Sequence, residues 1–120
     1  MIDGAHNVPA AKALAAFLQE FHPEGVWIVF GAMADKQYEE MISILKPHAQ
    51  HFMFTKAKTG RAKNPEDLQR LVAGSEVAST VDDAIHRAYA EAPPNATILI
   101  CGSLYLVGEA RDRVASLMLQ

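Results

Sequence analysis

The sequence has only one cysteine and no long apolar run, and these shortages exclude several classes of protein. Because Cys101 has no partner for an internal disulfide, a disulfide-built scaffold is excluded and a reducing, cytoplasmic environment is favoured. No stretch approaches the roughly 18 apolar residues that a membrane-spanning helix needs, and residues 1–4 lack the layout of a signal peptide. We therefore expect a protein that neither spans a membrane nor is secreted.

Basic residues and complete catalytic motifs are also scarce. The 14 acidic residues outnumber the 11 lysines and arginines, and a domain with a formal net charge of −3 repels nucleic acid. The chain has no GxxxxGK(S/T) phosphate loop, no GxGxxG turn, no Cys/His zinc spacing and no GxSxG elbow. We expect no nucleic-acid partner, no metal ligands in this chain and only part of a catalytic site.

The sequence does contain an alternation of buried strands and amphipathic helices. Half of the 120 residues are hydrophobic, which suffices for one core. Apolar, partly β-branched runs predict strands at residues 25–31, 51–55 and 97–102, and a weaker one at 76–79. Helical spacing of apolar residues predicts helices at residues 9–21, 36–45, 65–73, 81–92 and 104–119. The alternation predicts one three-layer α/β/α domain with a mostly parallel sheet.

The boundaries of these elements carry signals of their own. Polar residues that favour helix N-caps precede four of the predicted helices: Asn7, Asp35, Asn64 and Thr80. Asp3-Gly4 is typical of the exit from a strand, yet only two residues precede it. Either the first strand is vestigial or the chain is cut from something longer, and we expect a truncated first strand.

Ligands of open α/β sheets bind beyond the carboxyl ends of the strands, and residues 3–7, DGAHN, form the first such segment. There the Asp3 carboxylate can accept hydrogen bonds from ribose hydroxyls, and the His6 imidazole can bind a ligand or transfer a proton. The competing interpretation is structural. In it, Asn7 caps the helix, Asp3 stabilises the positive helix end and His6 is a surface residue. Both interpretations stay open.

Two segments with cationic residues follow the next two strands. Lys36 stands at the expected start of a helix, where the helix dipole disfavours a cation, so its charge suggests a phosphate or carboxylate contact. Residues 56–63 are a basic loop around Gly60 that contains Arg61 and is able to approach phosphates. For both segments, a solvated surface is the competing interpretation.

Residues 102–103 form a Gly-Ser turn between the last strand and the last helix. Backbone N–H groups and the Ser103 hydroxyl are expected to face the space above the sheet, where a helix N-terminus binds carboxylate or phosphate. The structural interpretation of Ser103 is a plain N-cap. The four residues that follow are expected to pack in the core: Leu104, Tyr105, Leu106 and Val107.

Three of these segments resemble those of a known family. DGAHN, the GAMADK after the GVWIVF strand, and CGSLYLVGEAR resemble the C-terminal domain of bacterial folylpolyglutamate synthases and dihydrofolate synthases, within the Mur ligase superfamily. The resemblance spans essentially all of the chain. It implies a Rossmann-like, Mur-ligase-type C-terminal domain at residues 1–120, without the N-terminal ATPase domain. Val8 stands where the family has proline, but Pro9 still falls in the first helical turn.

The resemblance also implies a reaction and its ligands. Members of the family use Mg-ATP to phosphorylate a carboxylate of dihydropteroate or of a folate's glutamyl tail, and the amine of L-glutamate attacks the acyl phosphate. The phosphate loop and the magnesium ligands belong to the N-terminal domain of the same polypeptide, over which the C-terminal domain closes. An isolated C-terminal domain is therefore expected to be catalytically inactive.

Candidate site residues follow from the resemblance, position by position. Asp3 resembles the residue that binds ATP through the ribose, and His6 the histidine near the reacting groups and the incoming glutamate. Ser103 resembles the serine that helps to hold glutamate. Lys36 and Arg61 match the family less closely and are candidates for cofactor binding, with a phosphate or carboxylate contact proposed for Lys36.

Three other functions compete with this assignment. A cell-wall Mur ligase also binds an incoming amino acid with its C-terminal domain, but DGAHN together with GSLYLVGEAR favours the folate branch. A non-catalytic nucleotide-binding module would share the fold and bind ATP tightly by itself. A phosphoacceptor receiver domain needs an acidic pair, an aspartate and a lysine at successive strand ends, where this chain has Asp3 alone, Thr55-Lys56 and residues 101–103.

Overall fold

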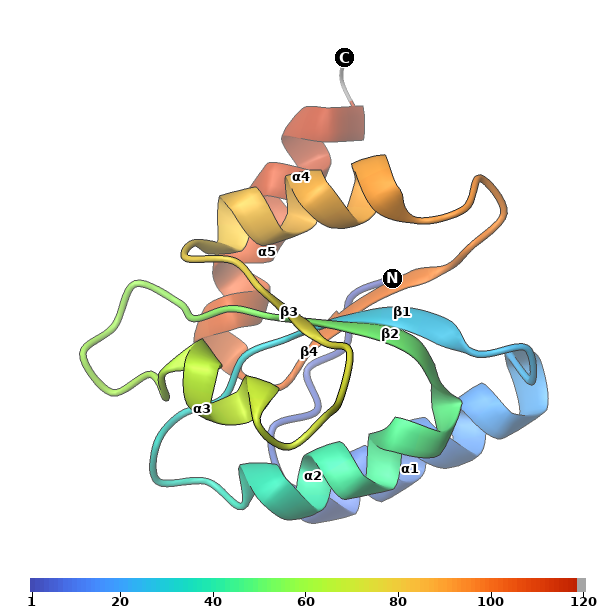
Figure 1. Cartoon of the computed structure of the whole chain (residues 1–120), viewed down its shortest axis with the longest axis horizontal. Coiled ribbons are helices and arrows are strands. Elements are labelled where there is room, and N and C mark those ends of the chain that lie inside the picture. Colours follow the sequence, from blue (N-terminus) through green and yellow to red (C-terminus); the bar gives the residue numbers. More distant parts are fainter. Residues whose placement is uncertain (119–120) are drawn as a thin grey trace.

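A parallel sheet forms the centre of the molecule. The computed structural model describes the backbone of residues 1–118 and the side chains of residues 1–115. In this part of the chain, four parallel strands form a sheet in the order β3-β2-β1-β4 (Figure 1). The strands are β1 Val26–Phe30, β2 Ala49–Phe54, β3 Glu76–Val77 and β4 Ile98–Cys101. The four predicted strands and the mostly parallel sheet are confirmed.

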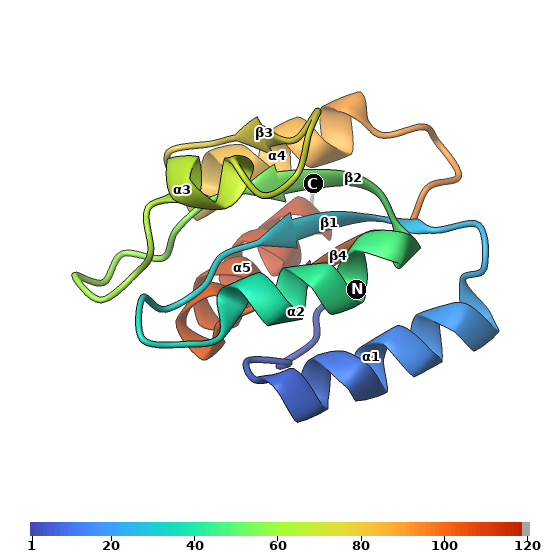
Figure 2. The ribbon, with the colours of Figure 1, turned by 60° about the horizontal axis from the view of Figure 1, so that its bottom comes forward.

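Helices cover both faces of the sheet. Within residues 1–118 they are α1 Val8–Phe21, α2 Tyr38–Leu45, α3 Pro65–Gln69, α4 Val81–Glu91 and α5 Leu104–Met118, with a short 3-10 helix, η1 Lys46–His48, before β2. The first three α-helices lie on one face of the sheet, and α4 and α5 lie on the other (Figures 1 and 2). None of the helices in this range is long and apolar enough to cross a membrane.

Strands β1 and β4 are apolar throughout because helices cover both of their faces. Ile28 and Phe30 of β1 pack with α1, α2 and α3, whereas Val29, between them, packs with α4 and α5. Residues of β4 alternate in the same way, and Cys101 is fully buried in the first of these two cores. The three-layer α/β/α prediction is therefore confirmed.

Two helix boundaries differ from the prediction by more than one residue. The second helix begins at Tyr38 instead of Lys36, and α3 ends at Gln69 instead of residue 73. Residues 70–75 form turns instead, closed by the Ser75 hydroxyl, which donates to the Val72 carbonyl oxygen over 2.7 Å. The predicted end of the last helix, Leu119, lies outside the described residues.

A fragment of an additional strand pairs with the free edge of β4. Ile2 forms a parallel bridge with Ile100, whose N–H donates to the Met1 carbonyl oxygen over 2.9 Å. The Asp3 N–H in turn donates to the Ile100 carbonyl oxygen over 3.0 Å. These contacts confirm a truncated first strand, and they hold residues 3–7 at the carboxyl end of β4.

Side chains cap two of the helices as expected. The Asn7 side-chain oxygen accepts a hydrogen bond from the Ala10 N–H over 2.9 Å, so the cap survives the replacement of the family's proline by Val8. The Thr80 hydroxyl accepts one from the Asp83 N–H over 3.1 Å. Both caps are confirmed, whereas Asn64 makes no side-chain cap and its prediction is wrong.

The difference between Thr80 and Asn64 makes a matched test of capping. We expect Thr80→Ala to lower the free energy of unfolding by about 1 kcal/mol, because the Asp83 N–H loses its partner. Asn64→Ala removes no such bond, so we expect it to change the free energy of unfolding by at most about 0.3 kcal/mol. Urea unfolding of both variants measures the difference, and equal losses would contradict the assigned caps.

Candidate functional site

The order of the strands places a crevice between β1 and β4. From β1 the chain continues into α2 on one face of the sheet, and from β4 it continues into α5 on the other face. The two connections therefore diverge, and such a reversal point is where open α/β sheets bind ligands. Figure 2 shows the connections after β1 and β2 at the same edge of the sheet as the start of α5.

A cavity of about 220 Å³ lies at this reversal point. Four of the five candidate site residues line it, although they come from four separate segments: His6, Lys36, Arg61 and Ser103. The remaining lining residues are Met33, Gly102, Leu104 and Tyr105. The fold thus brings together residues that are up to 97 positions apart in the sequence, from His6 to Ser103.

Glycines permit the close approach of β1 and β4 below this cavity. Gly102 has a φ of 115°, and a Cβ atom there would overlap the Gly31 carbonyl oxygen. A Cβ atom on Gly31 would itself lie 2.8 Å from the Thr55 carbonyl oxygen. Both strand ends therefore require glycine, and this lets the following Ser103 start α5 directly above the sheet.

Ser103 is both the cap of α5 and a wall of the cavity. Its side-chain oxygen accepts hydrogen bonds from the N–H groups of Tyr105 over 3.1 Å and Leu106 over 3.3 Å. The residue is only 3% exposed. Because a hydroxyl has two acceptor sites and one donor, the capping bonds use the acceptors and leave the O–H free to donate. The structural and the functional interpretations of Ser103 are therefore compatible.

The ring of His6 is oriented by its own segment. Its Nδ1 lies 2.8 Å from the Gly4 carbonyl oxygen, which can only accept, so Nδ1 carries the donated proton. In the neutral imidazole Nε2 is then unprotonated and can accept a proton or a hydrogen bond. The ring lines the cavity, so His6 is more than an ordinary surface residue.

Asp3 is the candidate that the structure leaves outside the cavity lining. Its Oδ1 accepts a hydrogen bond from the Ala5 N–H over 2.8 Å, which shapes the turn that leads to His6. Oδ2 can still accept from a ligand that extends past the cavity. The hydrogen bond to Ala5 is a local one, and the structural and ribose-binding interpretations of Asp3 both stay open. Burial and, secondarily, the Asp3 carboxylate raise the pKa of the Cys101 thiol.

Arg61 reaches the cavity because its loop pairs with the loop after β1. The Ala34 N–H donates to the Arg61 carbonyl oxygen and the Lys63 N–H to the Ala32 carbonyl oxygen, each over 2.8 Å. This strand-like pairing holds residues 32–34 extended, which explains why α2 begins later than predicted. The Arg61 guanidinium lies 3.2 Å from Asp35 Oδ2, and both side chains are exposed.

The pairing corrects two expectations about the loop after β1. Asp35 does not cap α2, since its carboxylate contacts Arg61 and the cap position is Gln37. Lys36 precedes the helix by two residues, so the conflict with the helix dipole that singled it out does not arise. Lys36 is nevertheless exposed at the cavity, and it forms no ion pair with any side chain of residues 1–115.

Leu104 and Tyr105 were missed as site residues by the sequence argument. They are 58% and 55% exposed and line the cavity, so the expectation that they belong to the core is wrong, whereas Leu106 and Val107 are buried as expected. The helical period does contain the signal. Residues four positions apart lie on the same face of a helix, so Leu104 and Tyr105 share a face with Gly108 and Glu109. Because Gly108 and Glu109 are not core residues, this face points outward.

The lining residues fit an anionic ligand. Lys36 and Arg61 supply positive charge, Ser103 supplies a free O–H, and the backbone N–H groups at the start of α5 supply a positive dipole end. Among the described residues, no group of three or more histidine, cysteine, aspartate or glutamate side chains is arranged to hold a metal ion. The fold and this cavity define a Rossmann-like domain with a candidate ligand site at its strand reversal point.

Comparison with known proteins identifies the family. Residues 1–104 match the family described as Mur ligase, glutamate ligase domain, and the chain belongs to this family. The chain is 39% identical over 116 residues to a probable bifunctional folylpolyglutamate synthase/dihydropteroate synthase of Haloferax volcanii, covering 92% of this chain and 14% of that protein. It is 32% identical over 117 residues to the dihydrofolate synthase/folylpolyglutamate synthase of Bacillus subtilis, covering 94% and 27%.

A solved structure agrees with these matches. The structure of Mycobacterium tuberculosis folylpolyglutamate synthase complexed with ADP superposes with a TM-score of 0.82 and 27% identity, covering 92% of this chain and 29% of that one. This chain thus spans between about a seventh and about a quarter of the length of the two curated relatives. The resemblance seen in DGAHN, GAMADK and CGSLYLVGEAR is confirmed.

Proposed function

We propose that the chain is the C-terminal domain of an ATP-dependent ligase that adds L-glutamate to dihydropteroate or to folylpolyglutamate through an acyl phosphate. The observation that carries this proposal is the meeting of His6, Lys36, Arg61 and Ser103 at one cavity, in a domain of the glutamate ligase family. The activities after which the relatives are named, and the ADP in the mycobacterial structure, support the choice of substrates. The family match is shared with cell-wall ligases, and the names of the relatives favour the folate branch.

Charge and hydrogen-bonding capacity suggest a role for each candidate residue. Lys36 and Arg61 face phosphate or carboxylate charge, and Asp3 Oδ2 accepts hydrogen bonds from the ribose hydroxyls of ATP. The Ser103 hydroxyl donates to a carboxylate of L-glutamate. His6 Nε2 takes a proton from the glutamate amine as that nitrogen attacks the acyl carbon and phosphate leaves.

The proposal requires a second domain of the same polypeptide. ATP and magnesium supply the activation of the carboxylate, and we place the phosphate loop and the magnesium ligands on an N-terminal ATPase domain. The present domain closes over it and keeps water from the acyl phosphate. We further propose a cytoplasmic location, which agrees with the buried, unoxidised Cys101.

A substitution at Ser103 can distinguish its role as a helix cap from its proposed role in binding glutamate. In the full-length ligase, Ser103→Asp keeps an acceptor for the Tyr105 and Leu106 N–H groups but removes the O–H donor and adds a repelling charge. We expect a KM for glutamate that is at least about tenfold higher, with a KM for ATP changed less than about twofold. Steady-state kinetics with each substrate varied in turn measures both constants.

Two further variants control this experiment. Ser103→Ala loses both the cap and the donor, so it is expected to raise the same KM and also to lower stability by about 1 kcal/mol. Thr80→Asp makes the same chemical change at the cap of α4 and is expected to leave both KM values unchanged. If Ser103→Asp changed only the KM for ATP, the assignment of Ser103 to glutamate would be wrong.

A binding measurement tests the competing, non-catalytic function. The present chain offers only part of a nucleotide site, so we expect weak binding of ATP in isothermal titration. A Kd below about 10 μM, equivalent to about −7 kcal/mol, would indicate a self-sufficient nucleotide-binding module and contradict the proposed role.

A further inference from the structure

The loop that carries Arg61, residues 55–64, is held at both ends but by different means. Its second half pairs with residues 32–34, as described above, through the Arg61 carbonyl oxygen and the Lys63 N–H. At its start the Thr55 N–H donates to the Phe30 carbonyl oxygen over 3.0 Å, which continues the sheet. Between these anchors lie residues 56–60, including Gly60, around which there is open space.

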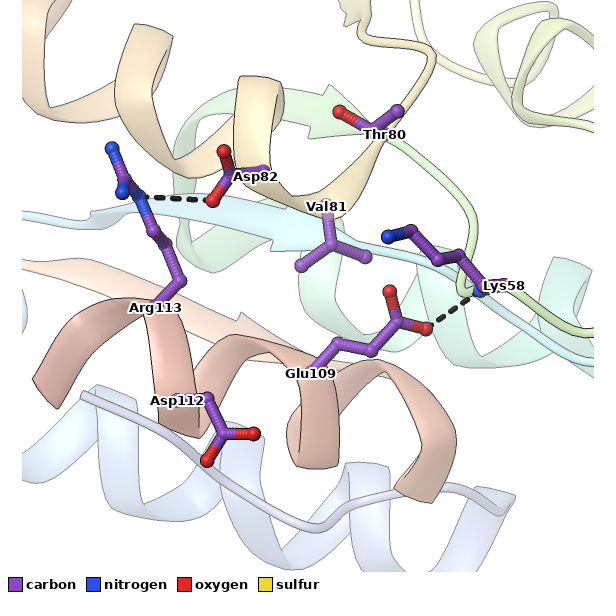
Figure 3. Close-up of a pocket in the computed structure, with 7 residues that line it drawn as sticks. All are labelled: Lys58, Thr80, Val81, Asp82, Glu109, Asp112 and Arg113. Carbon is purple, nitrogen blue, oxygen red and sulfur yellow. Dashed lines mark hydrogen bonds and ion pairs between the residues drawn. The ribbon is translucent and has the colours of Figure 1, made fainter. Parts of the chain in front are cut away.

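A single carboxylate on α5 anchors this middle stretch. Glu109 Oε2 accepts a hydrogen bond from the backbone N–H of Lys58 over 2.6 Å, across 51 residues of sequence (Figure 3). The other hydrogen bonds described for residues 56–60 are local. They join Thr59 to Ala57, Arg61 and Ala62. Within the described part of the chain, Glu109 therefore makes the long-range hydrogen bond that anchors residues 56–60, beside the buried side chain of Ala57.

The surroundings leave the Glu109 carboxylate available for this task. Glu109 lines a hollow of about 420 Å³ between α4 and α5, together with two other acidic residues. Arg113, the cation of the same helix that lines this hollow, is used elsewhere, since its Nε lies 2.9 Å from Asp82 Oδ1 of α4 (Figure 3). In Figure 3 the Glu109 carboxyl group points toward the Lys58 backbone, across the hollow from this ion pair.

One helix thus contacts two walls of the candidate site. Ser103 directly precedes α5, and Glu109, six residues further along, holds the loop whose second half provides Arg61. At 1.5 Å per residue, these two positions are about 9 Å apart along the helix axis. Glu109 lies within the CGSLYLVGEAR segment, in which the proposed function assigns a role only to Ser103.

We propose that Glu109 is a positioning residue, which holds Arg61 at the cavity by anchoring the backbone at Lys58. The proposal deepens the proposed function and rests on it for the ligand, but not for the contact between α5 and the loop. Glu109→Ala removes the acceptor, whereas Glu109→Gln keeps a side-chain oxygen of the same reach. A role through the hydrogen bond therefore requires that glutamine rescue what alanine loses.

The first experiment measures the loop itself, in this chain without ligand. We expect Glu109→Ala to raise the hydrogen-exchange rate of the Lys58 amide about tenfold or more, and to raise the mobility of the Arg61 Nε–H in ¹⁵N relaxation. In Glu109→Gln, the exchange rate of the Lys58 amide is expected to stay within about threefold of the rate in the parent chain. Unchanged exchange at Lys58 and unchanged relaxation at Arg61 in the alanine variant would overturn the proposal, as would a failure of glutamine to rescue them.

The second experiment measures the consequence for binding, by NMR titration of the chain with AMPPNP. We expect Glu109→Ala to weaken binding about fivefold and Glu109→Gln less than about twofold. In an Arg61→Ala background, Glu109→Ala is expected to have no further effect, because it acts through Arg61. Full additivity of the two changes would contradict the positioning role.

The two experiments also separate this proposal from the proposed function. If AMPPNP perturbs none of the cavity residues in the parent chain, the proposed nucleotide contact fails, while the exchange and relaxation data still decide whether Glu109 positions Arg61. If AMPPNP binds and Glu109→Ala leaves the loop and the affinity unchanged, the proposed function stands and the role of Glu109 is wrong. Arg111→Ala, on an exposed position of the same helix, is the matched control and should change neither measurement.

Discussion

Gly102→Ala is expected to lower the free energy of unfolding by about 3 kcal/mol or more, the largest stability effect of any change considered for this chain. Two costs add. The backbone φ of 115° disfavours any residue with a Cβ atom, and that atom would overlap the Gly31 carbonyl oxygen and press on the Phe30 ring. The neighbour is backbone at the end of a buried strand, so it cannot move aside without disturbing the pairing of β1 with β4.

Gly108 offers the matched control, because alanine there is expected to raise the free energy of unfolding instead of lowering it. Gly108 lies in α5 and is exposed, and a Cβ atom on it would meet nothing within 4 Å. Alanine at such a helical position is expected to raise the free energy of unfolding by about 0.5–1 kcal/mol. Urea unfolding at constant m value measures both variants. A Gly102→Ala loss of less than about 1 kcal/mol would contradict the tight crossing of the two strand ends.

The class of fold follows from local patterns in the sequence. The strands at residues 26–30 and 98–101 are short apolar runs with β-branched residues, and the apolar residues 52–54 mark the second strand. Helix periodicity and the caps at Asn7 and Thr80 mark where α1 and α4 begin. These signals depend on near neighbours in the chain, which is why the layers could be predicted without knowing any tertiary contact.

The geometry of the candidate site depends on contacts that leave no local signal. The late start of α2 and the position of Arg61 both result from the pairing of residues 32–34 with residues 61–63, which lie far apart in sequence. The Glu109 bond to Lys58 is equally long-range. By contrast, the outward position of Tyr105 could have been predicted from helical spacing, and it was missed because an apolar residue was assumed to be buried.

The strand reversal point explains why candidates from four segments converge. Residues after parallel strands all lie at one edge of the sheet, and the cavity lies where the connections after the adjacent strands β1 and β4 diverge to opposite faces. Ser103 and Lys36 come from these two connections, while His6 and Arg61 reach the same space from the flanking segments. Topology therefore accounts for the place of the cavity, and the chemistry of its lining residues is the basis for proposing an anionic ligand.

His6→Ala is expected to lower the kcat of the full-length ligase about 100-fold, with little change in the KM for ATP or glutamate, if His6 takes the proton of the attacking amine. The structure supports the required tautomer, because the Gly4 carbonyl oxygen lies 2.8 Å from Nδ1 and leaves Nε2 as the acceptor. His86→Ala is the matched control, since this histidine is exposed on α4 and does not line the cavity. Single-turnover and steady-state assays distinguish a slower chemical step from weaker binding.

The outcome of this substitution separates two roles for the same ring. A residue that only binds the ground state of glutamate raises KM when it is removed, whereas a proton acceptor acts in the transition state and lowers kcat. His6→Gln retains hydrogen-bonding capacity but has no group that accepts a proton near neutral pH. Restoration of kcat by glutamine would therefore assign His6 to binding alone, and a loss as large as that of alanine would assign it to proton transfer.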